Sequence, residues 1–242
     1  MAINDLFGKK LNVVNLGLES FQQSLKDTNT KFVQMDWRPP ANVNAKSASI
    51  INKNRELIAE ANKKALSIVL NGKPTLVGLD RALDIIPGMK DNLFLHAGPP
   101  VTWERMCGPM RGAILGAIIY EGMADNPRDA EKIAASDRIR FAPCHEHSTV
   151  GPMAGVVSPS MPVFIVKNEE YGNTAYCTMN EGLGKVLRYG AFSSEVIEKL
   201  RWMEIIMYPA LKKALEKIGR IDLKNIIAQA LHMGDEVHNR NR

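Results

Sequence analysis

The alternation of apolar and polar residues near the N-terminus predicts the start of an α/β fold. Leu11–Leu16 and Lys31–Met35 are short runs rich in apolar and β-branched residues, and a helix is expected between them from Ser20 to Leu25. Strand, turn, helix and strand in this order begin an α/β unit, so a Rossmann-like N-terminal part is expected. The first turn holds a single glycine, Gly17, and therefore lacks the GxGxxG fingerprint of dinucleotide-binding proteins.

The next stretch predicts a long helix followed by buried strands. Apolar residues recur at three- and four-residue steps from Ala45 to Leu70, which is typical of one long amphipathic helix. Strands are expected at Thr75–Leu79 and Leu93–Leu95, and the second leads directly into His96.

Residues 102–123 are expected to form a helix with a glycine-rich face. Gly108, Gly112 and Gly116 are spaced by four residues and therefore lie on one side of it. Because glycine weakens a helix by up to ~1 kcal/mol relative to alanine, three at this spacing indicate that something passes close by. That could be another backbone or a ligand, and we favour close helix packing.

The second half of the chain changes from mixed structure to helices. A strand is expected at Ile139–Phe141, and a β-hairpin is expected from Val163–Val166 and Thr174–Met179. Beyond Gly184 only helices are expected, with a kink before Pro209. A helix cap is expected at Asp222, which precedes the last of these helices.

The predicted fold class is therefore α/β in the sense of a mixed α+β chain, with three segments. Residues 1–100 form the Rossmann-like part, residues 101–183 a mixed segment with the hairpin, and residues 184–242 a helical segment that is expected to continue past the end of this chain.

Composition excludes several classes of protein. With 45% apolar and 24% charged residues, the 242-residue chain is an ordinary globular protein rather than a disordered, collagen-like or coiled-coil one. Three scattered cysteines without a CxxC motif disfavour a disulfide scaffold or a thiolate zinc site, and they fit the cytoplasm. The longest apolar run, Gly112–Tyr120, is too short for a membrane span, and we expect no signal peptide.

The net charge of +5 lies mostly near the C-terminus. Residues 183–242 carry eleven basic and seven acidic side chains, and the lysines alternate with apolar residues at helical spacing. This spacing favours the solvated faces of amphipathic helices over a nucleic-acid surface, so no nucleic-acid partner is predicted.

The histidines indicate where chemistry could take place. All five lie in three short segments beside glycine or proline, at 96–100, 145–149 and 232–241. Such positions at the ends of strands and helices are typical of a site at the edge of an α/β sheet. We expect the three segments to meet in one cleft, and the alternative is three unrelated loops.

The central segment predicts an anion-binding loop. If the chain is extended there, His145 and His147 point to the same side, where they suit either a metal ion or hydrogen bonds to an anion. Ser148 and Thr149 add hydroxyl groups, and Gly151 exposes backbone N–H groups. We favour the anion, so no cofactor is predicted, and a divalent metal at the histidine pair is the alternative.

Six segments together resemble the YlbE/YahG family of bacterial proteins, and this resemblance covers the whole chain. They are NVVNLGLESF (12–21), VQMDWRPP (33–40), HAGPPVTWERMCGPMRGA (96–113), APCHEHSTVGPMAGVVSP (142–159), NEGLGKVLRYGA (180–191) and LHMGDEVHNRN (231–241).

The resemblance implies a subunit of oxamate carbamoyltransferase, an enzyme of anaerobic allantoin and purine catabolism. Such an enzyme passes the carbamoyl group of carbamoyl-oxamate (oxalurate) to phosphate. The family member is one of three different subunits, so the implied partners are an FdrA-like subunit and a third subunit encoded in the same operon. The family continues past the C-terminal motif, where this chain stops.

Carbamoyl transfer needs an anion site, donors to the carbamoyl oxygen and an acid for the leaving nitrogen. From their chemistry we assign catalytic roles to His145, His147 and His238. The predicted substrate- and anion-binding residues are His96, Arg105, Ser148, Thr149, Gly151, Asn239 and Arg240. Two other functions stay open, a metal-dependent hydrolase that uses His145 and His147, and a non-catalytic scaffold for an FdrA-like partner.

Overall fold

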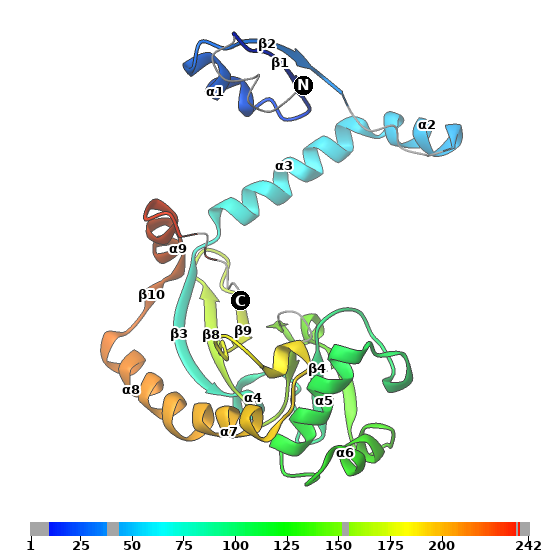
Figure 1. Cartoon of the computed structure of the whole chain (residues 1–242), viewed down its shortest axis with the longest axis vertical. Coiled ribbons are helices and arrows are strands. Elements are labelled where there is room, and N and C mark those ends of the chain that lie inside the picture. The colour runs from blue at the N-terminus through cyan, green and yellow to red at the C-terminus, as the bar shows by residue number, and fades with distance from the viewer. Residues whose placement is uncertain (1–9, 38–43, 152–154, 236, 238–242) are drawn as a thin grey trace. The chain divides into compact units, whose positions relative to one another are not determined.

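The structure, a computed structural model, describes residues 10–37, 44–151, 155–235 and 237. The chain divides into two compact units, residues 1–65 and 66–242. Helices and both parallel and antiparallel strand pairs are present, so the predicted mixed α+β class is confirmed (Figure 1). The predicted segment boundaries at residues 100 and 183 stay predictions.

The first unit contains the predicted strand–helix–strand arrangement. β1 (Asn12–Leu16) and β2 (Lys31–Met35) pair in parallel, and α1 (Phe21–Asp27) connects them. Val14 and Val33 are register partners, and each is 59% exposed. Two parallel strands alone do not establish a Rossmann-like sheet, and that detail of the prediction is not confirmed.

The long helix predicted for residues 45–70 is wrong as a single element. The structure has α2 (Ala45–Lys53) and α3 (Arg55–Asn71), separated at Asn54. The Asn54 side chain donates a hydrogen bond of 2.8 Å to the carbonyl oxygen of Ile50. A short amide side chain that bonds to the neighbouring backbone competes with regular helix geometry, which explains the break.

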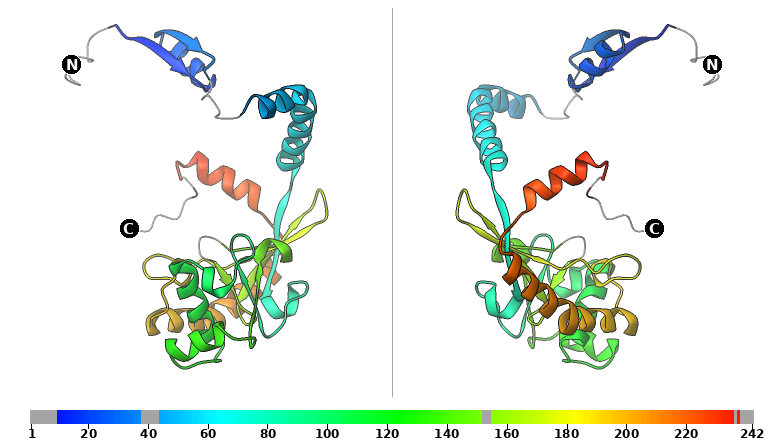
Figure 2. Two further views of the ribbon diagram at one scale, coloured as in Figure 1. Left: turned by 90° about the vertical axis from the view of Figure 1, so that its right-hand side faces the viewer. Right: turned by 90° about the vertical axis from the view of Figure 1, so that its left-hand side faces the viewer.

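A five-stranded sheet forms one part of the second unit. Its strands, in spatial order, are β10 (Ile221–Asp222), β3 (Pro74–Arg81), β8 (Pro162–Asn168), β9 (Thr174–Thr178) and β6 (Thr149–Val150). β8 and β9 pair antiparallel, which confirms the predicted hairpin, and its tip extends from the body of this unit (Figure 2). β6 joins β9 in parallel, and β3 is antiparallel to both of its neighbours.

A second sheet of three strands carries the first histidine segment. β4 (Leu93–His96) lies between β5 (Arg140–Pro143), to which it is parallel, and β7 (Val156–Val157), to which it is antiparallel. His96 is the last residue of β4 and is the register partner of both Pro143 and Val156.

The helix predicted over residues 102–123 is shorter in the structure. A 3₁₀ turn, η2 (Trp103–Arg105), precedes α5 (Gly108–Tyr120), which is followed by α6 (Pro127–Ala134). Pro109 lies in the first turn of α5, where its missing N–H and fixed φ are tolerated. A helix running through from residue 102 would place this proline in its interior, so α5 begins here.

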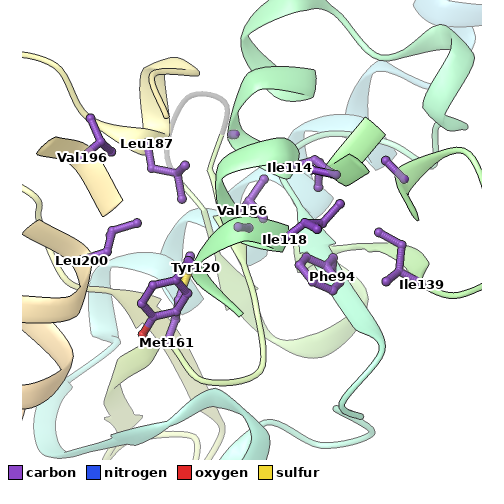
Figure 3. Close-up of a cluster of buried hydrophobic side chains, with 14 of the residues drawn as sticks. Phe94, Ile114, Ile118, Tyr120, Ile139, Val156, Met161, Leu187, Val196 and Leu200 are labelled. Carbon is purple, nitrogen blue, oxygen red and sulfur yellow. The ribbon is translucent and has the colours of Figure 1, made fainter. Parts of the chain in front are cut away.

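The core of the second unit lies around α5. Phe94 packs with Ile114, Ile118 and Ile139 on one side of the helix (Figure 3). Apolar side chains from η4 (Leu187–Tyr189) and α7 (Ser194–Trp202) belong to the same cluster. Burial of these side chains stabilises the arrangement by about 25 cal/mol for each Å² of apolar surface removed from water.

Close packing, as predicted, is seen at two of the three glycines of α5. A methyl group on Gly112 would overlap the carbonyl oxygen of Gly190, and one on Gly116 would meet Leu187 and Phe192. A methyl group on Gly108 would meet no atom within 4 Å. Two of the three glycines therefore serve close packing with residues 187–192.

The C-terminal part is largely helical. A π-helical turn, η5 (Met203–Met207), connects α7 to α8 (Tyr208–Ile218), and this irregularity lies where a kink before Pro209 was predicted. α9 (Leu223–His232) begins after Asp222, whose carboxylate accepts a hydrogen bond of 3.0 Å from the N–H of Asn225, so the predicted cap is confirmed. The expectation of helices alone is wrong, because β10 pairs with β3 at residues far away in sequence.

Asp80, near the end of β3, connects the sheet to α8. Its carboxylate accepts hydrogen bonds of 2.6 Å from the hydroxyl of Tyr208 and from the ammonium group of Lys212. Partial burial opposes ionisation of Asp80, but these hydrogen bonds outweigh it, so the pKa of the carboxyl group lies below its usual value.

Candidate anion-binding pocket

His96 is a buried histidine, and one of its two ring nitrogens has no hydrogen-bond partner among the described residues. Its side chain is only 1% exposed, although it ends a strand beside a loop. Nδ1 lies 3.0 Å from the carbonyl oxygen of Ala97, and Nε2 is buried without a hydrogen-bond partner among the described residues. Buried polar atoms normally have partners, so an unpaired one indicates a place for a ligand or a proton.

A pocket of about 450 Å³ lies beside this histidine. Its walls come from the end of β4, the loop after it, η2 and the end of β5. The lining residues are His96, Pro99, Pro100, Val101, Thr102, Arg105, Phe141 and Pro143. The size suits a small molecule. The structure therefore brings together two of the predicted binding residues, His96 and Arg105.

The register of the sheet places His96 on the same face as two residues that line the pocket. Phe94 and His96 are two residues apart on β4 and so share one face, and their partners on β5 are Phe141 and Pro143. Both partners line the pocket. Because Nδ1 bonds back to the main chain, the unpaired Nε2 is the ring nitrogen directed away from it.

A residue that the sequence reasoning missed supports Arg105. Arg111, in the second turn of α5, donates a hydrogen bond of 2.8 Å to the carbonyl oxygen of Glu104 and stacks over Trp103 at 5.1 Å from the ring centre. Both contacts hold the 3₁₀ turn that presents Arg105. The sequence alone indicated this contact only weakly. Trp103 and Arg111 are eight residues apart, and their relative positions depend on the turn between them.

The prediction of an extended chain at His145 and His147 is wrong. Residues 144–147 form a 3₁₀ helix, η3 (Cys144–His147). Successive residues in such a helix turn by about 120°, so side chains two apart point in different directions. His145 is exposed. Nδ1 of His147 lies 2.9 Å from the carbonyl oxygen of Pro87, and the His147 ring lies beside Gly88. Neither ring lines the pocket beside His96.

The predicted hydroxyl and glycine positions follow directly after this turn. Ser148 is exposed and has a left-handed backbone with φ of 52°. Thr149 is 4% exposed and donates its hydroxyl to the carbonyl oxygen of His147 at 2.9 Å. A methyl group on Gly151 would lie 2.9 Å from the carbonyl oxygen of Gly155, so this glycine permits a close approach of two backbone segments.

The predicted residues of the third segment are not tested by the structure. His238, Asn239 and Arg240 lie outside the described residues, so their roles stay predictions. The structure does not bring residues 145–149 into one pocket with His96. Only Pro143, two residues before that segment, is the strand partner of His96 and lines the pocket. Across the described residues, no group of three or more His, Cys, Asp and Glu side chains is arranged to hold a metal ion.

Cys144, the first residue of η3, is a buried thiol. Burial raises its pKa to about 12. At neutral pH it is therefore protonated, which excludes an activated thiolate nucleophile at this position.

In the described part of the chain, no helix is both long and apolar enough to cross a bilayer.

Comparison with known proteins supports the resemblance seen in the sequence. The family model for the oxamate carbamoyltransferase subunit AllG matches residues 139–242. The chain is 46% identical to the uncharacterized protein YahG of Escherichia coli K12 over 241 residues, which are 98% of this chain and 51% of YahG. It is 41% identical to the oxamate carbamoyltransferase subunit AllG of the same organism over 186 residues, 76% of this chain and 44% of AllG.

A solved structure is similar to this chain in fold as well as in sequence. The crystal structure of a conserved protein of unknown function from Enterococcus faecalis V583 superposes with a TM-score of 0.73 at 50% identity, over 77% of this chain and 45% of that one. The chain thus spans about half the length of the relatives it matches. Over that half, the chain fits a family that contains YahG- and AllG-like proteins.

Proposed function

We propose that this chain works as part of a carbamoyltransferase that moves a carbamoyl group between carbamoyl-oxamate and phosphate, in the breakdown of allantoin and other purine products. The observation that carries the proposal is the 41% identity to AllG over 186 residues. The proposed partners are an FdrA-like subunit and a third, different subunit, and the proposed location is the cytoplasm.

The pocket beside His96 supplies the kind of environment that such a reaction needs. The oxamate product carries a carboxylate, and phosphate is an anion as well. The guanidinium group of Arg105 suits either one, because its planar fork can bind two oxygen atoms at once. Among the described residues that line the pocket, Arg105 is the only one with a permanent charge.

The reaction makes defined demands on the site. A phosphate oxygen attacks the carbamoyl carbon, the bond from that carbon to the oxamate nitrogen breaks, and the nitrogen takes up a proton. A cation that holds the oxamate carboxylate in place lowers the barrier by orienting the leaving group. We assign this orientation to Arg105, with the hydroxyl of Thr102 available as a further donor on the same wall.

The proposal is tested in an assembly of the complete protein with its co-expressed partner subunits. Oxalurate and phosphate are supplied, and the formation of carbamoyl phosphate is measured. We expect Arg105→Ala to lower kcat/KM by roughly 10- to 150-fold, because a hydrogen-bonded charge contributes about 1.5–3 kcal/mol. The matched control is Arg128→Ala on α6, an exposed arginine outside the pocket, which should leave the rate unchanged.

Two results would contradict the proposal in different ways. If the wild-type assembly forms no carbamoyl phosphate, the activity is wrong. If the assembly is active and Arg105→Ala is as active as Arg128→Ala, the pocket is not the site, and a scaffold role for this chain is favoured.

A further inference from the structure

We propose that His96 is a hydrogen-bond acceptor in the pocket, and that the pocket binds a small molecule in which an N–H group stands next to an anionic group. The N–H would face Nε2 of His96, and the anionic group would face Arg105. This inference deepens the proposed function at the same pocket, but its test needs neither partner subunits nor turnover.

The direction of the hydrogen bond at Nδ1 is the first step. Nδ1 of His96 lies 3.0 Å from the carbonyl oxygen of Ala97. A carbonyl oxygen only accepts, so Nδ1 must carry the hydrogen atom. In a neutral imidazole the other nitrogen then has no hydrogen and presents a lone pair. The sequence predicts His96 only as a substrate- or anion-binding residue, and the contact with Ala97 makes its other ring nitrogen an acceptor.

The burial of Nε2 is the second step. The atom is buried and has no partner among the described residues, and the side chain is 1% exposed. Leaving a buried acceptor without a hydrogen bond costs free energy. A ligand that donates a hydrogen bond to Nε2 therefore gains more binding free energy than it would from an exposed nitrogen. A ligand that presents only oxygen lone pairs or a methyl group leaves the atom unpaired.

Arg105 supplies the complementary half of the site. It lines the same pocket as His96, and it presents donors only. One acceptor and one cationic donor on residues that line the same pocket fit a ligand with an N–H donor and an anionic acceptor close together. A simple dianion matches Arg105 but not a neutral His96.

The arrangement has a consequence for the proposed reaction, and this part rests on the proposed function. When an amide nitrogen attacks the carbon of carbamoyl phosphate, a C–N bond forms, and the C–O bond to phosphate breaks with its electron pair going to phosphate. The nitrogen must lose one proton, which Nε2 of His96 accepts. In the opposite direction, the same Nε2–H returns the proton to the leaving nitrogen.

The test compares two probes of nearly equal shape, oxamate and pyruvate, at pH 8 by titration calorimetry with the 242-residue chain. Pyruvate has a methyl group where oxamate has NH₂. We expect oxamate to bind at least about fivefold more tightly, the ratio expected from about one net hydrogen bond. Arg105→Ala should weaken both probes by the same factor and keep their ratio, and Arg128→Ala should change neither affinity.

His96→Ala should abolish the preference for oxamate. Because His96 is buried, this variant is useful only if its circular dichroism spectrum matches that of the wild type. A ¹⁵N spectrum of histidine-labelled wild-type protein provides a second readout, and it should show the hydrogen on Nδ1 of His96.

The proposal is overturned if the wild type binds pyruvate as tightly as oxamate, if it binds neither, if folded His96→Ala keeps the preference, or if Nε2 carries the hydrogen. An oxamate preference in a protein whose full assembly makes no carbamoyl phosphate would overturn the proposed function alone.

Discussion

Replacing Gly112 by alanine provides a direct test of how α5 is held in the second unit. A methyl group there would overlap the carbonyl oxygen of Gly190 and lie 3.0 Å and 3.1 Å from two further backbone atoms of that residue. Gly190 cannot easily move away, because its own φ is +85° and it packs against Pro109. The atoms in the way are therefore backbone atoms rather than the end of a flexible side chain.

The size of the effect follows from two opposing terms. Inserting a methyl group into a packed interior costs about 1–3 kcal/mol, and the immobile neighbour favours the upper end. Alanine regains about 1 kcal/mol of helix propensity. The free energy of unfolding should thus fall by roughly 2 kcal/mol, or Tm by roughly 4–8 °C for a unit of this size.

Urea unfolding followed by circular dichroism measures this change. The matched control is Gly108→Ala on the same helix, which meets no atom within 4 Å and should leave the free energy of unfolding unchanged or slightly higher. If Gly112→Ala proves as stable as Gly108→Ala, the close packing of α5 against residues 187–192 is wrong.

Three other predictions concern a cap, a charge and a thiol. Asp222→Ala should lower the free energy of unfolding by about 1 kcal/mol in urea melts, whereas Ser193→Ala, at a cap without a side-chain hydrogen bond, should have less effect; equal losses would contradict the cap. The lowered pKa of Asp80 means that its stabilising effect is present above the unfolded-state pKa and is lost as pH falls through the lower folded-state pKa. Asp80→Asn should therefore flatten the fall in stability below about pH 4 in pH-dependent melts, and an unchanged slope would refute this role. Iodoacetamide at pH 8 should modify exposed Cys107 well before buried Cys144, whose pKa is raised to about 12, as peptide mass spectrometry would show; the reverse order would contradict its burial.

Local sequence determined several parts of this protein. Short runs rich in apolar and β-branched residues predicted β1 and β2, and the two runs at 163–166 and 174–179 predicted the β8–β9 hairpin. Asp222 marked the start of α9 because an N-cap needs only its own side chain and an N–H three residues on. The α5 glycines indicated close packing, because their four-residue spacing on a helix defines a face whatever lies opposite.

Parts of the candidate site also depended on local signals. His96 and Arg105 are nine residues apart, and their position after a buried strand indicated a site. Their common pocket depends in addition on Phe141 and Pro143, which reach it only because β5 pairs with β4.

Only the tertiary structure decided the remaining features. The turn at residues 144–147 took 3₁₀ geometry, with His147 hydrogen-bonded to Pro87, 60 residues away. Ile221 and Asp222 form strand β10 by pairing with Leu76 and Thr75 of β3, which are far away in sequence. The role of His96 depends on which nitrogen is bonded and which is buried. Contacts between residues that are far apart in the sequence leave no periodic pattern in it. The spacing of residue types could therefore not predict which of these hydrogen bonds form or which atoms become buried.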